Sequence, residues 1–200
     1  MRGVQGVKQL LEAAIALALI GSAAVPAAAQ HAGGFSPLQV GKVDRLLQLV
    51  QKRLDLAPGI AELRWRTMAR IEDSPSEHAM LEQVRSRSAK IGLDEKFAVR
   101  FTEAQIEAAK IIQTARHRQW AADSAGAPTR DKNADAFKSS ASEPEVGSDM
   151  LTAARDAMTV LRRRGGRALL DARAADFIRT GGPDLLAAQA ALKPLYEIAN

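Results

Sequence analysis

The chain has 200 residues, no cysteine and a formal net charge of +5. Without cysteine it cannot form disulfides, a thiol nucleophile or a zinc–thiolate site. It holds five Phe, two Trp and one Tyr, which are too few and too scattered for the stacking platforms of single-strand nucleic-acid binders. We therefore expect no nucleic-acid partner.

The first 29 residues predict a signal peptide. Arg2 and Lys8 provide a positive start, and Leu10–Ile20 is a short apolar run. Small residues follow, and Pro26–Ala29 fits the pattern that signal peptidase recognises, so we predict cleavage after Ala29. The expected location of the mature protein is therefore the periplasm or the medium.

A membrane anchor is the alternative interpretation of this segment. The apolar run contains Glu12 and is shorter than the ~20 residues that span a bilayer, so we expect no stable anchor. Cleavage leaves 200 − 29 = 171 residues, which suits one domain. Removing Arg2, Lys8 and Glu12 lowers the net charge from +5 to +4, which favours anionic ligands.

The spacing of apolar residues predicts an all-α fold, a bundle of about six helices. A first helix over 36–54 should stop at Ala57–Gly59, and a shorter one should cover 60–71. The sequence Ser74–Glu77 is typical of a capping box, with Ser74 as the cap, and should start the third helix. No segment predicts a strand.

One long helix is predicted to form the spine of the bundle. Gly92 should end the third helix, and Asp94 should cap a helix through Trp120 that is about 40 Å long. Residues 121–147 are polar and contain two prolines, which predicts a flexible linker. Residues 148–200 should form further helices that complete the same domain.

Four polar side chains lie on or beside the predicted apolar stripes: Arg53, Arg64, Gln113 and Arg155. Burying an unpaired charge costs several kcal/mol, so three such arginines suggest an anion-binding pocket. The alternative is that they reach solvent or pair with Asp55, Glu62 or Asp73.

Most familiar catalytic signatures are missing. The sequence has no nucleophile elbow, no phosphate-binding glycine loop and no two histidines at ligand spacing. We therefore expect neither a metal nor another cofactor. The basic cluster Arg162–Arg167 is interpreted as a helix C-terminus, where cations and glycine are favoured.

The stretch from Arg53 to Trp120 contains Arg64-Trp65-Arg66, Ile71-Glu72-Asp73-Ser74 and the run Phe101–Gln113. In order and spacing it resembles the all-helical chorismate mutases, specifically their exported class. The resemblance implies a fold like that of the type II enzymes. Residues 30–120 would be the catalytic half.

This resemblance implies an enzyme that rearranges chorismate to prephenate by an intramolecular Claisen reaction, without cofactor or covalent intermediate. Such a reaction needs a positioned substrate and stabilisation of charge on the ether oxygen. By family position, Arg53 and Arg155 would bind the two carboxylates of chorismate. Arg64 and Gln113 would face the ether oxygen.

By family position, Asp73 and Glu77 would lie near the ring hydroxyl. Three positions depart from the family pattern, which has lysine at Arg64, arginine at Ser76 and serine or threonine at Ala109. The planar guanidinium of Arg64 cannot place a compact ammonium against the ether oxygen as a lysine does. Each lost contact would cost about 1–3 kcal/mol, so activity would fall roughly ten- to a few-hundredfold per site.

Several alternatives stay open at this point. Arg70 or Arg85 could replace the missing guanidinium. The chain could be a non-catalytic secreted relative that binds an anion or a protein, or an enzyme similar to the isochorismate pyruvate-lyases. The resemblance also leaves a homodimer open, because cytoplasmic members build each site across two chains.

Overall fold

The computed structural model describes residues 34–131, 143–179 and 184–200. Within these ranges the chain forms six helices and no strand, which confirms the all-α prediction. The predicted signal peptide lies outside the described residues.

The first described helix, α2 (Pro37–Thr67), contains 31 residues. It starts with a capping box, because the Ser36 hydroxyl accepts from the Gln39 amide at 3.4 Å while the Gln39 side chain accepts from the Ser36 amide at 2.9 Å. Met68 ends the helix in a left-handed conformation, with φ of 58°.

The prediction of two helices separated at Pro58 is wrong. A proline inside a helix removes one backbone hydrogen bond and usually costs about 3 kcal/mol. Here the helix continues through it because the same stripe is buried on both sides: Leu54, Ala57 and Ala61 are at most 1 % exposed. Burial of apolar surface on both sides of the proline therefore offsets the lost bond.

Helix α3 (Ser74–Ile91) starts one residue away from the predicted cap. Asp73, not Ser74, is the N-cap, and its carboxylate accepts from the Ser76 amide at 3.3 Å. Glu77 closes the arrangement by accepting from the Asp73 amide at 3.3 Å. A carboxylate at a helix N-terminus gains from the helix dipole as well as from the hydrogen bond, which favours Asp73 over the serine hydroxyl.

Helix α4 (Glu95–Ala122) confirms the predicted long helix. Gly92 ends α3 in the left-handed conformation, with φ of 70°, and Asp94 accepts from the Phe97 amide at 2.7 Å. The 28 residues of α4 span about 42 Å at 1.5 Å per residue. The helix is therefore long enough to reach from one end of the bundle to the other.

The C-terminal half contains α5 (Glu143–Leu161), α6 (Gly166–Arg179) and α7 (Leu185–Ile198). Helix α5 begins inside the segment expected to be a linker. Within that segment, residues 123–131 are not helical.

Polar contacts hold this described part against the end of α2. The Trp65 indole donates to the Pro128 carbonyl at 3.1 Å, and the Asp131 amide donates to the Arg66 carbonyl at 3.0 Å. The Arg130 guanidinium lies 4.4 Å from the centre of the Trp65 ring. The described residues that follow α4 are thus bound to the domain rather than free of it.

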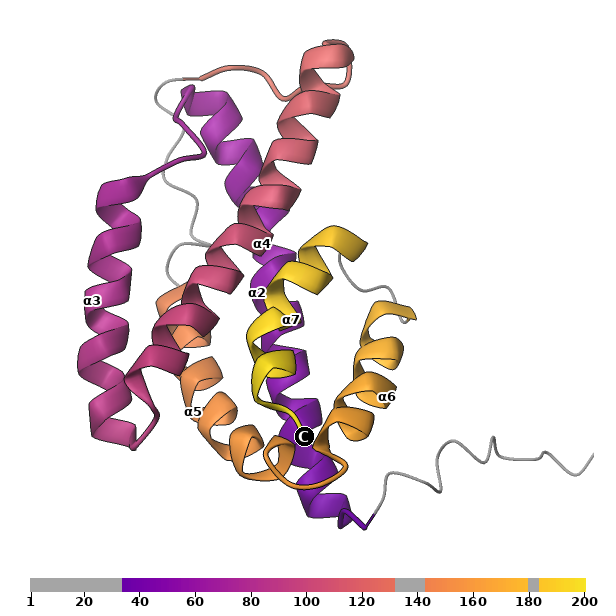
Figure 1. Cartoon of the computed structure of the whole chain (residues 1–200). Helices are drawn as coiled ribbons and strands as arrows, with labels where there is room; N and C mark the ends of the chain where they lie inside the picture. Colours follow the sequence, from indigo (N-terminus) through magenta and orange to yellow (C-terminus); the bar gives the residue numbers. More distant parts are fainter. Residues whose placement is uncertain (1–33, 132–142, 180–183) are drawn as a thin grey trace, which may run out of the picture. The chain divides into compact units, whose positions relative to one another are not determined.

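Helix α2 packs against α4, α5 and α6, and α7 packs against α4. The largest side chains with less than 2 % exposure come from five helices and include Leu46, Val50, Phe97, Phe101, Leu161, Leu169, Leu192 and Leu195. Helix α3 stands at one edge of this bundle (Figure 1) and buries only Val84 and Ser88. The edge position of α3 leaves space between it and the rest of the domain.

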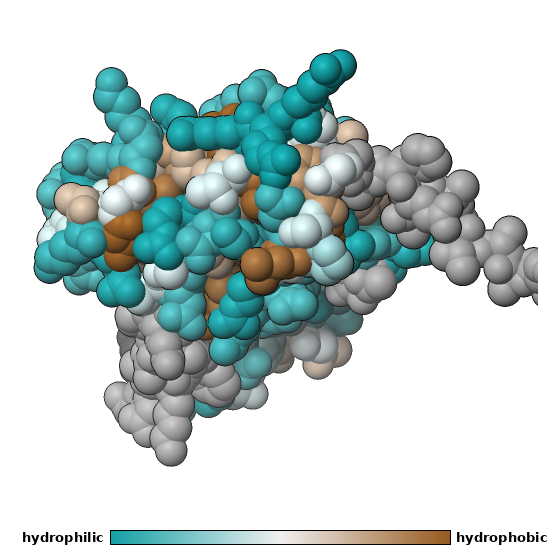
Figure 2. Space-filling view, turned by 90° about the horizontal axis from the view of Figure 1, so that it is seen from below, coloured by the Kyte–Doolittle hydropathy of each residue, from teal (hydrophilic) through white to brown (hydrophobic). Residues whose placement is uncertain are grey.

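None of the described helices is both long enough and apolar enough to cross a membrane. The face shown in Figure 2 is covered mainly by hydrophilic residues, and its hydrophobic residues form small separate patches. On this face the apolar residues therefore do not form a continuous surface.

Gly166 provides a test of how tightly α5 and α6 are joined. A Cβ added there would overlap the backbone of Leu161. We expect Gly166→Ala to destabilise the protein by about 1–3 kcal/mol, the usual cost of overpacking.

The matched control is Gly41→Ala, because a Cβ at that helical position meets no atom within 4 Å. The control should gain about 0.5–1 kcal/mol. Thermal unfolding of the two variants should shift in opposite directions, and equal shifts would contradict this account of the α5–α6 corner.

Candidate functional site

A cavity of about 630 Å³ lies between α3 and the neighbouring helices α2, α4 and α5. Its volume is in the range of small-molecule sites. Apolar side chains form part of the wall, among them Met80, Val84, Met150 and Leu151. The cavity therefore offers apolar surface for a ring together with polar groups for orientation.

The charges on the cavity wall all have one sign. Arg53, Arg87 and Lys90 line it, and no Asp or Glu of the described ranges does. Arg53 is only 5 % exposed, and its Nη2 lies 3.9 Å from the Met80 sulfur. A cavity with cationic walls and low-dielectric surroundings favours an anionic ligand.

Arg53 occupies the position that the sequence pattern assigned to it. It follows Leu46 and Val50 on the buried stripe of α2, and both of these residues are fully buried. The neighbouring α3 contributes Ser76 to the same cavity. The structure thus brings together two of the predicted substrate-binding residues.

Arg64 is engaged in the turn between α2 and α3. Its Nη1 donates to the Arg70 carbonyl at 2.8 Å and also to the Ile71 carbonyl, and its Nη2 lies 3.9 Å from the Asp73 carboxylate. The pairing with Asp73 is the alternative that the sequence left open. The planar guanidinium holds the turn together, so its donors already have partners.

Lys110 is a charged residue of this region that the sequence analysis did not single out. Its Nζ lies 2.7 Å from Glu72 and 2.9 Å from Glu77, and only 15 % of its side chain is exposed. Burial lowers the pKa of Lys110, but the hydrogen bonds and charges of Glu72 and Glu77 outweigh burial and raise the pKa above its ordinary value. Lys110 therefore fixes the carboxylate of Glu77 against α4.

Helix α4 carries the remaining predicted residues of this region, Ala109 and Gln113, which are both buried. Gln113 Oε1 has no hydrogen-bond partner in the described part of the chain. Gln105 Oε1 on α4 likewise has no partner in the described residues, but its Nε2 donates to the Ala191 carbonyl of α7 at 2.8 Å. A buried amide oxygen without a partner is costly, so Gln113 is suited to bind a ligand or a water molecule.

Arg155 lies apart from the other predicted residues. Its Nη1 donates to the carbonyl of Ile91 at 3.3 Å, and its Nη2 pairs with Asp156 at 2.7 Å. Ile91 is the last residue of α3, whereas Ser76 and Glu77 belong to its first turn. Lys90, the residue before Ile91, lines the cavity, but Arg155 itself does not.

The course of α5 explains this separation. Asp149 pairs with Arg45 at 3.9 Å. Asp156, about two turns further along α5, lines a hollow together with Pro37 and Lys42. Helix α5 therefore runs antiparallel to α2. Beyond Leu151, which still lines the cavity, α5 continues toward the start of α2 and away from Arg53.

Comparison with known proteins bears on these residues directly. Residues 42–114 match the family model of chorismate mutase type II. The solved chorismate mutase from Burkholderia thailandensis is 25 % identical, with a TM-score of 0.66 over 77 % of this chain and 98 % of that one. Residues 42–114 therefore carry the pattern of the type II chorismate mutases, and the described helices share the fold of the solved enzyme. The matched residues include every predicted site residue except Arg155.

Two further solved structures share the fold. The chorismate mutase from Burkholderia phymatum is 18 % identical, with a TM-score of 0.68 over 78 % of this chain and 97 % of that one. The secreted chorismate mutase from Yersinia pestis is 16 % identical, with a TM-score of 0.60 over the same shares of the two chains. Comparison with curated proteins gives no match.

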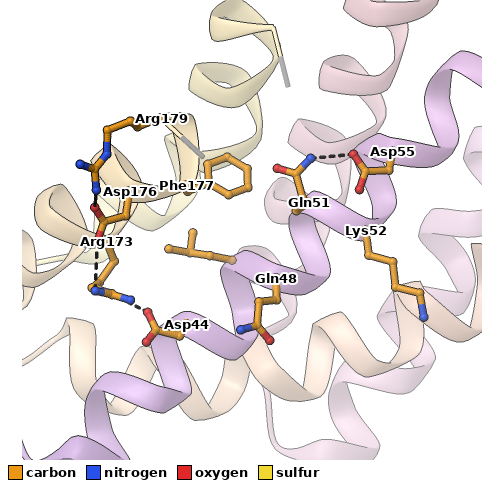
Figure 3. Close-up of a pocket in the computed structure, with 10 residues that line it drawn as sticks. Asp44, Gln48, Gln51, Lys52, Asp55, Arg173, Asp176, Phe177 and Arg179 are labelled. Carbon is orange, nitrogen blue, oxygen red and sulfur yellow. Dashed lines mark hydrogen bonds and ion pairs between the residues drawn. The ribbon is translucent and has the colours of Figure 1, made fainter. Parts of the chain in front are cut away.

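A second hollow, of about 740 Å³, lies between α2 and α6 (Figure 3). Arg173 bridges Asp44 at 2.6 Å and Asp176 at 3.2 Å, and Arg179 pairs with Asp176 at 2.5 Å. The charged residues on its wall are three acids and three bases: Asp44, Asp55, Asp176, Lys52, Arg173 and Arg179. This hollow is larger, but its charges balance and it contains none of the predicted site residues. The cationic cavity is therefore the candidate chorismate mutase site.

Replacement of Lys110 tests the charge cluster beside the cavity. Lys110→Met should lower the free energy of unfolding by about 1–2 kcal/mol, because Glu77 and Glu72 lose a partly buried hydrogen-bonded partner. The folded-state pKa of Lys110 is raised above 10.5, so its contribution is fully present below pH 10.5 and is lost as the pH rises through the folded-state value.

Denaturant titrations across alkaline pH measure this difference. Lys193→Met is the matched control, because Lys193 is exposed on α7 and has no ion pair in the described part of the chain. A difference between wild type and Lys110→Met that does not shrink as the pH rises through the folded-state pKa would contradict the assignment.

Proposed function

We propose that the chain is an exported chorismate mutase that converts chorismate to prephenate in the cavity between α2, α3, α4 and α5. The observation that carries the proposal is the position of Arg53, a buried guanidinium inside a cavity whose described charges are all positive. The family match over α2, α3 and α4 supports the same reaction.

The reaction breaks a carbon–oxygen bond and forms a carbon–carbon bond within one molecule, so no group has to be transferred to the protein. Catalysis then consists of holding the reactive conformation and stabilising the negative charge that develops on the ether oxygen. Arg53 is assigned to one substrate carboxylate. The side-chain NH2 of Gln113 is assigned as the donor to the ether oxygen, and Glu77, fixed by Lys110, is assigned to the ring hydroxyl together with Asp73.

The departures from the family pattern favour a slow enzyme. Arg64 already binds two carbonyls of the turn and lies beside Asp73, so its fork is not directed at a substrate atom. Ser76 and Ala109 bring no charge to the site. We expect these changes to lower the rate of rearrangement more than they lower affinity for the substrate, because stabilisation of the ether oxygen needs a donor at one defined place.

The direct test is turnover of chorismate by the purified full chain. Loss of the ultraviolet absorbance of chorismate should exceed the buffer blank, and acid treatment should convert the product to phenylpyruvate. No turnover at micromolar enzyme would overturn the proposed reaction. Release of pyruvate from isochorismate would indicate a lyase in its place, and binding of chorismate without turnover would indicate a non-catalytic relative.

Two buried glutamines of α4 provide a matched pair of variants for this assay. Gln113→Leu should lower kcat roughly ten- to a hundredfold, since a hydrogen bond to a developing charge is worth about 1.5–3 kcal/mol. Gln105→Leu should lower the unfolding temperature, because its amide bonds to α7, and should leave kcat close to wild type. Equal effects on kcat would contradict the role of Gln113.

The proposed export rests on the first 29 residues and fits a fold shared with a secreted relative. Expression of the full chain in a Gram-negative bacterium should give a periplasmic protein whose mass corresponds to a start at Gln30. Ala29→Lys should block processing, because signal peptidase requires a small residue there, while Ala24→Ser should be processed normally. An unprocessed wild-type chain in the cytoplasmic fraction would contradict export.

A further inference from the structure

The proposed substrate carries two carboxylates, and the predicted residues include a cation placed to bind only one of them. Arg53 is placed for the first. The residues assigned by resemblance to the second carboxylate are not available for it: Arg155 is bound to Ile91 and Asp156 and does not line the cavity, and position 76 is serine. A dianion in this cavity therefore needs a second cation from elsewhere.

Helix α3 presents two such cations to the cavity, Arg87 and Lys90. Both line it on the same face of the helix as Ser76 and Met80, as the spacing of three and four residues requires. Neither forms an ion pair with another described residue. The nearby Arg85 differs, since it pairs with Glu82 at 2.5 Å and with Glu95 at 3.8 Å and does not line the cavity.

The geometry of α3 directs Arg87 toward Arg53. Arg87 follows Met80 by seven residues, two turns or about 10 Å, and long side chains on a helix lean toward its N-terminus. An Arg87 side chain that follows this tendency extends toward Met80, the residue that Arg53 contacts at 3.9 Å. The two guanidinium groups thus belong to opposite walls, with the apolar side chains of Val84 and Leu151 in the same cavity.

We propose that Arg87, assisted by Lys90, binds the second carboxylate of chorismate and takes over the task of the arginine that the family has at position 76. The proposal rests on the proposed function and adds a substrate-binding residue to it. The guanidinium can bind a carboxylate through two parallel hydrogen bonds. Lys90, one turn further along α3, adds charge to the same wall.

Steady-state kinetics of the full chain with chorismate test this assignment. Arg87→Gln should raise KM roughly ten- to a hundredfold, because a charge-assisted contact is worth about 1.5–3 kcal/mol, and should change kcat much less. Arg87→Lys should recover part of the loss, since it keeps the charge but not the fork. The matched control Arg85→Gln should leave KM within about twofold of wild type, because its guanidinium does not line the cavity.

The outcomes separate this inference from the proposed function. If wild type turns over chorismate and Arg87→Gln has the KM of Arg85→Gln, the assignment of Arg87 is wrong while the function stands. If wild type shows no turnover, the function fails, and calorimetric titration with chorismate then decides the inference. Weaker binding to Arg87→Gln than to Arg85→Gln supports it, and equal binding or none overturns it. Circular dichroism of each variant establishes that it is folded.

Discussion

The burial of Arg53 is the constraint on which the rest of this site depends. A guanidinium stays charged at every pH a protein tolerates, so its place in the bundle requires polar surroundings or an anionic partner. The stripe of α2 carries Arg53 inward because the residues before and after it, Val50 and Leu54, are part of the core. Helix α3, which faces Arg53, must therefore cover the guanidinium without enclosing it in apolar side chains.

Helix α3 meets this condition by being held mainly at one end. In the turn before it, Arg64 binds two backbone carbonyls, and in its first turn Glu77 bonds to Lys110 of α4. Further along, Val84 and Ser88 are its only buried residues. Polar anchoring at the start and sparse packing after it leave the cavity open, and the exposed face of α3 then contributes cations to its wall.

Local rules of sequence predicted the parts of this fold that local physics decides. Gly92 and Asp94 act within a few residues of the helix ends that they form. The burial of Arg53 follows from the periodicity of apolar residues within one helix. Pro58 misled the prediction because packing of α2 against α4 and α5 overrides the local cost of a proline. The Asp73 cap was missed by one residue because a carboxylate and a hydroxyl competed for the same amide groups.

The contacts that define the site are of another kind, because they join residues far apart in the chain. Lys110 was not predicted, since a lysine on a helix usually faces solvent, and its partners Glu77 and Glu72 lie 33 and 38 residues away. Arg155 lies on the apolar stripe predicted for α5, but the direction of that helix relative to α2 decides whether Arg155 reaches the cavity. No pattern within α5 contains this information.

The charges of the site and their geometry have different consequences for the reaction. Attraction of a dianion depends on the sum of nearby charges and on their distances, so the cations of α3 that line the cavity can substitute for the charge the family has at position 76. Stabilisation of the ether oxygen depends on one donor at one place, and a fork bound to turn carbonyls cannot supply it. We therefore expect the chain to retain affinity for chorismate better than it retains the rate, with Gln113 carrying most of the stabilisation that remains.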